Sequence, residues 1–251
     1  MSRLLLLECA ARLGPGTVDF GEEKRLIRDA VGRGRYGAAF TVEDAPSLQW
    51  GDLLFELDAF RPTLVHFSGH GYDDGTLRIR TPDGGSAPAD SDGLCGLLAA
   101  LDPPPMLVVF NACWSAKLAE QAAKALPCTI GINGTVSDRA VIAFARYLYG
   151  MLTGGRTIEY AALMAVQAAR THGLDEWNRI GLFIGDDSHA LRNVVPASHF
   201  SSPSTTTPHK PGTASALARL RGSPDNITRA KGVLEALGLL QSWEDTDKDH
   251  G

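Results

Sequence analysis

The stretch from Met106 to Ser115 constrains the fold of this chain most strongly. Its sequence is Met-Leu-Val-Val-Phe-Asn-Ala-Cys-Trp-Ser, and three prolines at positions 103–105 precede it. Proline is poorly tolerated inside helices and central strands, so a new element must begin after it. The apolar run that follows is rich in β-type residues and too short for a typical helix, whereas residues 115–126 have helical spacing. We therefore predict a buried strand that ends at Cys113 and a helix that follows it.

A second strand of the same design is predicted over residues 64–71. This stretch, Leu-Val-His-Phe-Ser-Gly-His-Gly, is apolar and ends with His70 between two glycines. If the two strands are parallel neighbours, the His70 imidazole and the Cys113 sulfur lie at one edge of one sheet, where open α/β sheets hold their sites. A nucleophile and its base are adjacent in space rather than in sequence. The two strand ends therefore predict a base–nucleophile pair.

The rest of the first 190 residues alternates between similar strands and amphipathic helices. Such alternation predicts an α/β fold with a mostly parallel sheet and helices on both faces. A small hairpin over 77–85 should interrupt it, because Asp83-Gly-Gly85 is a turn sequence. The expected strands are 4–10, 38–42, 64–71, 106–113, 128–132 and 180–184. The expected helices are 22–31, 50–60, 91–101, 115–126, 137–152 and 158–171, with Ser91 or Asp92 as a candidate cap of the third.

Composition limits the partners and the setting. The chain has 251 residues, of which 44% are hydrophobic, enough for a substantial core. Its net charge of −5, from 24 basic and 29 acidic residues, predicts neither nucleic acid nor a membrane surface as a partner. The four scattered cysteines lack metal-type spacing, and no segment approaches the ~18–20 apolar residues of a membrane span. We therefore expect a cytoplasmic protein with free thiols and without a metal or cofactor.

The sequence divides into three parts. Residues 1–196 are expected to form one domain, and residues 197–212 are a linker rich in Ser, Thr and Pro. Residues 213–251 contain two short amphipathic segments that predict a small helical appendage. An appendage of this size is marginal for independent folding. It either packs on its own domain or binds a partner protein.

The two strand ends resemble those of the caspase-like cysteine peptidases, and within them those of the CHAT family. The motifs are Ser68-Gly-His70-Gly71 and, on the second strand, Asn111-Ala-Cys113. The resemblance covers roughly residues 1–190 and does not reach the linker or the appendage. Further similar positions are Thr76-Leu77, Asp83-Gly84, Leu97-Leu98, Ser115-Ala116, Val136-Ser-Asp138, Phe144, Leu148-Tyr149 and Phe183-Ile-Gly-Asp186.

The resemblance implies a role for each residue of the pair. Cys113 would be the nucleophile, and His70 would take its proton, because a thiol with a pKa of ~8.5 is mostly protonated at neutral pH. The backbone N–H groups of Gly71 and Cys113 would form the oxyanion hole. CHAT proteins are commonly effectors in prokaryotic defence or programmed death that cleave a particular protein. They are often inactive until a sensor or adaptor activates them, and here residues 213–251 could bind that partner.

The resemblance also suggests a specificity residue. In separase-like relatives an acidic residue in a matching stretch lines the S1 pocket, so Asp138 would favour Arg or Lys at P1. The alternative is that Ser137 or Asp138 only caps the helix that begins there. The other cysteines, Cys9, Cys95 and Cys128, are expected to be inert core residues. His66 is expected to be a hydrogen-bonded core residue, because two strand positions separated by ~13 Å cannot share a metal ion with His70.

Two other classes of function remain open. One is a non-catalytic caspase-like module that recruits partners through its C-terminal helices, and the other is a thiol transferase or hydrolase acting on small molecules. A phosphate-binding loop is not predicted, because the glycines at 69, 71 and 75 lead into a hairpin rather than into a helix.

Overall fold

The computed structural model describes residues 1–9, 20–171, 175–185 and 194–195, all within one compact unit, Met1–Phe200. The predicted linker at 197–212 and the predicted appendage at 213–251 lie outside the described residues. No helix in the described part of the chain combines the length and apolar character that a bilayer crossing requires.

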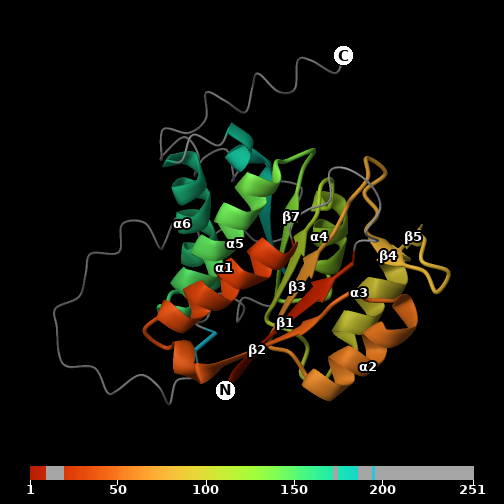
Figure 1. Ribbon diagram of the computed structural model, residues 1–251, viewed down its shortest axis with the longest axis horizontal. Helices are drawn as coiled ribbons and strands as arrows, with labels where there is room; N and C mark the ends of the chain where they lie inside the picture. The colour runs from red at the N-terminus through yellow and green to blue at the C-terminus, as the bar shows by residue number, and fades with distance from the viewer. Residues whose placement is uncertain (10–19, 172–174, 186–193, 196–251) are drawn as a thin grey trace. The chain divides into compact units, whose positions relative to one another are not determined.

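The described residues form a six-stranded sheet in the order β2-β1-β3-β6-β7-β8 (Figure 1). All neighbours are parallel except β7 and β8, which are antiparallel. A separate antiparallel hairpin, β4 (Arg78–Arg80) and β5 (Ser86–Pro88), confirms the predicted one. The strands of the large sheet are β1 (Ser2–Glu8), β2 (Phe40–Ala45), β3 (Leu64–Ser68), β6 (Leu107–Asn111), β7 (Cys128–Ile132) and β8 (Ile180–Ile184).

Helices cover both faces of this sheet, so the predicted fold class is confirmed (Figure 1). One face packs against α1 (Phe20–Arg33), α5 (Asp138–Thr153) and α6 (Ile158–Thr171). The other packs against α2 (Trp50–Phe60), α3 (Ser91–Ala99) and α4 (Ala116–Ala122). Two short 3₁₀ turns, η1 (Gly37–Ala39) and η2 (Asp175–Arg179), precede β2 and β8.

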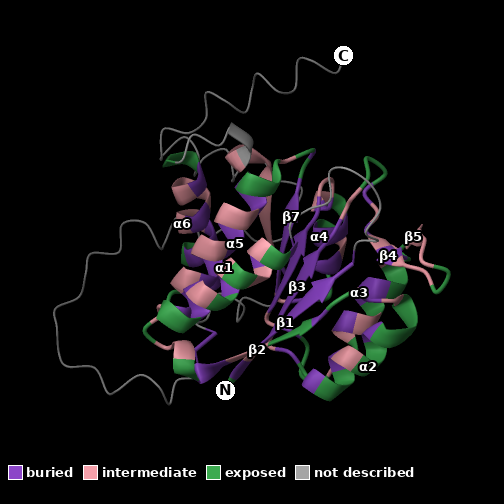
Figure 2. Ribbon diagram, viewed as in Figure 1, coloured by how far each residue is buried: buried purple, intermediate pink, exposed green. Residues whose placement is uncertain are grey.

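The central strands β3 and β6 are buried along their whole length (Figure 2). Side chains alternate between the faces of a strand, so each strand supplies both cores. Leu64 contributes to the core beneath α1, α5 and α6, whereas Val65 and Phe67 contribute to the core beneath α2, α3 and α4. In that second core Phe67 stacks on Phe110 of β6, with ring centroids 5.4 Å apart. Burial on both faces explains why these strands are mostly apolar, with polar exceptions at His66, Ser68 and Asn111.

Several predicted boundaries were wrong. The strands expected over 4–10, 64–71 and 106–113 end at Glu8, Ser68 and Asn111, so His70 and Cys113 lie just beyond their strands. The strand expected over 38–42 begins at Phe40 and extends to Ala45, because pairing with β1 continues to that residue. The cap of α3 is Asp90, whose side chain accepts the N–H of Asp92. The helix after Cys113 begins at Ala116 and ends at Ala122, four residues before its expected end.

We predict that Phe110→Ala costs about 3–5 kcal/mol of stability, because truncating a fully buried aromatic ring leaves a cavity. Phe55 on α2 is 72% exposed, so Phe55→Ala, the matched control, should change stability by no more than about 0.5 kcal/mol. Urea unfolding of the two variants measures both values. Equal losses would contradict the assignment of the second core.

Candidate active site

The register of β3 and β6 brings the two predicted site segments to the same edge of the sheet. Ser68 and Asn111, the last residues of the two strands, are paired. The Gly69 N–H donates to the Asn111 carbonyl at 3.4 Å, so the chains separate just beyond this pair. His70 and Cys113 each follow two residues later, and both are half-buried. This edge is formed by the carboxyl ends of parallel strands, the usual place for a site in such sheets.

The segments after the two strands are in direct contact through Gly71. A Cβ atom at Gly71 would lie 1.7 Å from the Cys113 carbonyl oxygen, so only glycine fits there. Gly71 also faces Leu77 across an isolated antiparallel bridge. The bonds of that bridge run from Arg78 N–H to the His70 carbonyl and from Tyr72 N–H to the Thr76 carbonyl, at 3.3 and 3.4 Å. Neither bond uses the Gly71 N–H.

The turn that carries Cys113 is tied to β7 and to the loop after it. The Trp114 N–H donates to the Gly134 carbonyl at 3.0 Å, and Trp114 has a φ of +61°, which is uncommon for a bulky residue. Ser115 does not cap α4 with its side chain. Its hydroxyl donates to the Phe110 carbonyl at 2.7 Å and accepts the Ile132 N–H at 3.0 Å. These bonds hold the turn in a strained conformation of the kind that is common at active sites.

The Cys113 thiol donates to the Val136 carbonyl oxygen, with sulfur and oxygen 3.8 Å apart. Among the hydrogen bonds of the described residues there is none between the side chains of Cys113 and His70. The structure therefore places the two residues at the same edge, with the thiol directed to the loop after β7. Direct proton transfer between them requires a contact that the described hydrogen bonds do not include.

Asp138 is exposed and is the first residue of α5. Ser137 is the N-cap of that helix, and its hydroxyl accepts the Ala140 N–H at 3.4 Å. Of the two predicted capping residues, Ser137 therefore has the capping role, and an acidic Asp138 in the first turn is favourable for the helix dipole. Asp138 lies two residues after Val136, whose carbonyl contacts the thiol.

Arg179, which the sequence did not reveal, holds the loop that precedes α5. Its guanidinium donates to the carbonyl and to the hydroxyl of Thr135, and its own carbonyl accepts the Asn133 N–H at 2.7 Å. The residue comes just before β8, far from this loop in sequence. A lone arginine between a predicted helix and strand carries no signal for such a contact.

The other three cysteines are buried, unlike Cys113. Burial, reinforced by the charge of Glu8, raises the pKa of Cys9. Burial and the charge of Glu159 do the same for Cys128. Burial also raises the pKa of Cys95, with smaller effects from Asp92 and Asp90. Their thiols are therefore poor nucleophiles, and Cys113 is the most accessible cysteine of the described residues.

A buried polar network lies beneath the strand ends, on the face covered by α1 and α5. The His66 Nε2–H donates to Glu23 Oε1 at 3.1 Å, and Nδ1 lies 2.9 Å from the Tyr149 hydroxyl. The Asn111 side-chain amide donates to the same Glu23 oxygen. Side chains of Glu23 and His66 are 0% exposed. The expectation that His66 is a hydrogen-bonded core residue is confirmed.

Glu23 is ionised in this network. Burial acts to raise its pKa, but hydrogen bonds from His66 and Asn111 outweigh that effect, and the net pKa is below its usual value. Burial, with the charge of Glu23, raises the pKa of Tyr149 well above its usual value, so the phenol stays protonated. Glu23 was detectable in principle, because it lies one and two turns before Ile27 and Val31 on the apolar face of α1.

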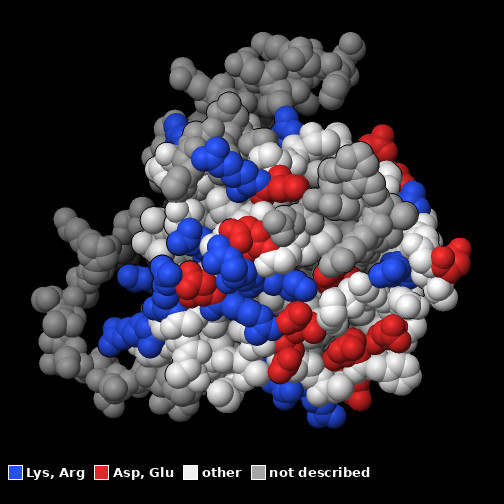
Figure 3. Space-filling model, in the orientation of Figure 1, with Lys and Arg blue, Asp and Glu red and all other residues white. Residues whose placement is uncertain are grey.

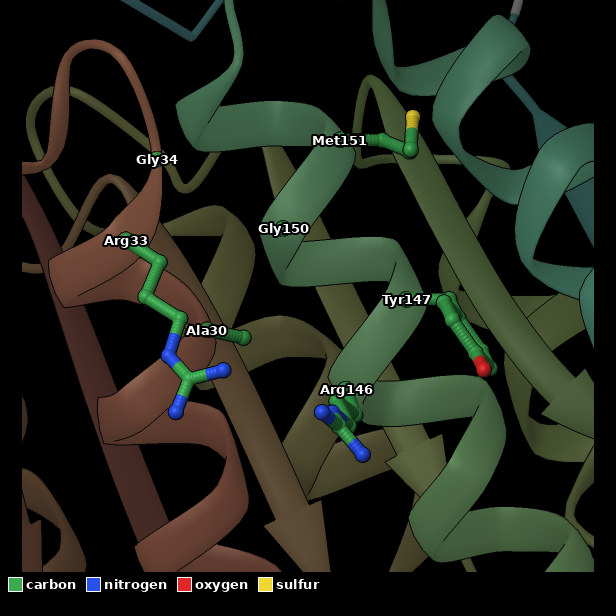
Figure 4. A pocket seen from close by; sticks show the side chains of 7 residues that line it. All are labelled: Ala30, Arg33, Gly34, Arg146, Tyr147, Gly150 and Met151. Carbon is green, nitrogen blue, oxygen red and sulfur yellow. The ribbon is translucent and has the colours of Figure 1, made fainter.

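Two pockets occur elsewhere on the described surface. One of about 210 Å³ lies between α1 and α5, with Arg33 and Arg146 on its two sides (Figure 4). The other, of about 290 Å³, is lined by residues of α2 and α3 and by Pro103. Neither contains His70, Cys113 or Asp138. Both pockets lie near the amino ends of the strands. The first is lined by the last turn of α1, and the second by residues that come shortly before β3 and β6.

Basic side chains gather over α1 (Figure 3). Four of them form ion pairs with carboxylates, so this surface does not point to a polyanionic ligand. The pairs are Lys24 with Glu8 and Asp44, Arg25 with Glu22, Arg28 with Asp44, and Arg33 with Asp29. The described residues also contain no cluster of three or more His, Cys, Asp or Glu side chains arranged to hold a metal ion.

Comparison of the sequence with models of known protein families gives no match, and comparison with curated proteins gives none either. Function must therefore be inferred from the geometry of the strand ends and from the motifs there.

We predict that Gly71→Ala lowers stability by about 1–3 kcal/mol, because the added methyl group would displace the Cys113 carbonyl. Gly96→Ala in α3 is the matched control. A Cβ there meets no atom within 4 Å, and alanine should stabilise the helix by roughly 0.5–1 kcal/mol. Urea unfolding measures both changes. A Gly71→Ala protein as stable as wild type would show that the two segments are not in contact.

Glu23 and Glu159 should affect acid stability in opposite directions. The lowered pKa of Glu23 means that its contribution is complete above about pH 4.5 and is lost as the pH falls through the lowered pKa. Burial raises the pKa of Glu159, so its contribution is complete below its usual pKa and is lost as the pH rises through the raised pKa.

The variants Glu23→Gln and Glu159→Gln test these signs by urea unfolding at about pH 6.5 and about pH 3.5. The stability advantage of wild type over Glu23→Gln should shrink at the lower pH. Relative to Glu159→Gln, wild type should instead gain stability there. A wild-type advantage over Glu23→Gln that grows in acid would contradict the ionised state of Glu23.

Proposed function

We propose that this protein is a cysteine endopeptidase with Cys113 as its nucleophile and His70 as its base. The observation that carries the proposal is the register of β3 and β6, from which both residues follow at one sheet edge. The partial exposure of Cys113, against the burial of the other cysteines, supports the choice of nucleophile. The resemblance of the motifs at 68–71 and 111–113 to CHAT peptidases points to the same chemistry.

The reaction would proceed through an acyl-enzyme. His70 takes the proton of the Cys113 thiol as sulfur attacks the peptide carbonyl, and the N–H groups of Gly71 and Cys113 bind the resulting oxyanion. Collapse of this intermediate breaks the C–N bond, and His70 returns the proton to the leaving amine. Water, deprotonated by His70, then attacks the thioester, releases the acid and restores the thiol. Neither N–H group donates to a backbone carbonyl in the described contacts, which is compatible with this role.

The contact of the thiol with the Val136 carbonyl suggests a resting state. In this contact the sulfur faces the Val136 carbonyl and makes no hydrogen bond with His70 among the described residues. The sulfur would turn toward His70 in a fraction of the isolated molecules, and a sensor or adaptor bound through residues 213–251 would raise that fraction. On this account the protein is a cytoplasmic effector of prokaryotic defence or programmed death that cleaves one protein target.

Asp138 is proposed to select Arg or Lys at P1. Three observations support it: the side chain is exposed, it lies close in sequence to Val136, and Ser137 already supplies the cap of α5. A carboxylate at this position can form a charge-assisted hydrogen bond with a basic side chain.

The resting contact of the thiol also favours a second candidate, a non-catalytic binding module in which the pair never closes. Such a protein would recruit partners through residues 213–251 and would not modify them. A thiol transferase acting on small thioesters is the third candidate, and it would use the same pair.

The test is labelling by peptidyl acyloxymethyl ketones that differ at P1. Wild type and Cys95→Ala should be labelled at Cys113, whereas Cys113→Ala and His70→Ala should not. Asp138→Asn should reduce labelling by probes with basic P1 by roughly 10-fold to 100-fold and leave neutral probes unaffected. A different P1 preference would remove the claim for Asp138 alone. Turnover of small thioesters without labelling would favour the transferase.

No labelling, either of the isolated chain or in lysate from stressed native cells, would contradict the peptidase. Capture of a partner through residues 213–251 under the same conditions would then identify the binding module.

A further inference from the structure

The hydrogen-bond network of Glu23 lies directly beneath the level at which His70 and Cys113 leave the sheet. Along β3 and β6 the paired positions on the α1 face are His66 with Val109 and then Ser68 with Asn111. The next positions of that alternation are 70 and 113, where the ladder has already ended. Asn111 therefore stands between the buried carboxylate of Glu23 and the turn that carries Cys113.

The start of α1 contacts four strands, and on three of them the contact is at or near the carboxyl end. Lys24 forms ion pairs with Glu8 at the end of β1 and with Asp44 near the end of β2, at 3.4 and 3.5 Å. Glu23 accepts hydrogen bonds from His66 of β3 and Asn111 of β6. Lys24 is partly exposed, whereas Glu23 is fully buried, so the bonds of Glu23 are the stronger constraint.

We propose that Glu23 is a positioning residue, which fixes Asn111 and His66 and thereby sets the relative placement of Cys113 and His70. This inference rests on the proposed function and names a residue that acts through others. Glu23 itself does not touch the reacting atoms.

Few direct hydrogen bonds join the two strand ends to each other, although Trp114 and Ser115 tie the turn of Cys113 to β7 and to the loop after it. Beyond Ser68 and Asn111, the only ladder-like bond between the two segments in the described part of the chain is the 3.4 Å contact from the Gly69 N–H, which is long for a hydrogen bond. One carboxylate oxygen bound to both strands couples the middle of β3 to the end of β6. Burial strengthens both bonds, because water does not compete for the charge.

A merely stabilising role would look different from a positioning role. Loss of a structural contact lowers the unfolding free energy but leaves the chemistry of the folded molecules unchanged. Loss of a positioning contact changes the reactivity of Cys113 in molecules that are still folded. The rate of Cys113 alkylation separates the two, and it needs neither a peptide substrate nor an activator.

The experiment measures the rate at which iodoacetamide alkylates Cys113 in the native full-length chain, read from the Cys113 peptide by mass spectrometry. The variants are Glu23→Gln, which keeps the size of the side chain, Asn111→Ala, their combination, and His70→Ala. Glu159→Gln is the matched control, because Glu159 is a partly buried carboxylate near Cys128, at the opposite end of the strands. Circular dichroism establishes that each variant is folded under the assay conditions.

We expect His70→Ala to slow alkylation, and Asn111→Ala to slow it at least about 10-fold, because a misplaced pair loses most of its assistance. Glu23→Gln keeps an oxygen for both donors but loses the charge, so it should slow alkylation less than Asn111→Ala. The double variant should be no slower than Asn111→Ala, since the two residues act as one unit. Glu159→Gln should react at the wild-type rate. If Glu23→Gln does not fold, Asn111→Ala, which removes only the donor, gives the decisive rate.

Two results would overturn the inference in distinguishable ways. Alkylation that depends on His70 but is unchanged by folded Glu23→Gln and Asn111→Ala would remove the positioning role and leave the peptidase intact. Alkylation at the same rate in wild type and His70→Ala would contradict the base–nucleophile pair itself, and the positioning role with it.

Discussion

Parallel pairing of β3 with β6 is the constraint on which the rest of the structure depends. These strands form the middle of the sheet, and every one of their residues is buried. Their side chains supply both cores, so a shift by one residue would exchange the two faces and leave polar His66 and Asn111 against the wrong layer. The same register sets the level at which His70 and Cys113 leave the sheet. The register of β3 and β6 therefore determines both the packing of the two cores and the position of the candidate site.

The polar residues at the carboxyl edge are arranged in layers. Glu23, His66 and Tyr149 are fully buried and connected by hydrogen bonds, and Asn111 links them to the edge. Above them lie half-buried His70 and Cys113, and beside these the loop of Val136 and Asp138. Burying a charged group costs free energy unless hydrogen bonds compensate for the lost hydration. The two bonds that Glu23 Oε1 accepts connect α1 to both central strands, whereas the buried Oε2 has no hydrogen-bond partner among the described residues.

Much of this arrangement could be predicted from the sequence, because it depends on local periodicity. The apolar runs of the central strands, the helical spacing of 50–60 and 158–171, and the turn at Asp83-Gly-Gly85 each determine their own element. What the sequence could not show are partners far apart in the chain. Glu23 and Asn111 are 88 residues apart, and Arg179 is 44 residues from Thr135. The direction of the Cys113 thiol likewise depends on a loop from another strand.

The most direct test of the account is a crystal structure of the chain after reaction with a peptidyl aldehyde that has arginine at P1. The account predicts a covalent bond from Cys113 sulfur to the aldehyde carbon, and a His70 ring nitrogen within about 3.2 Å of the adduct. The adduct oxygen should lie between the N–H groups of Gly71 and Cys113. An adduct at Cys113 with the His70 imidazole turned away from it, or an adduct on another cysteine, would contradict the account.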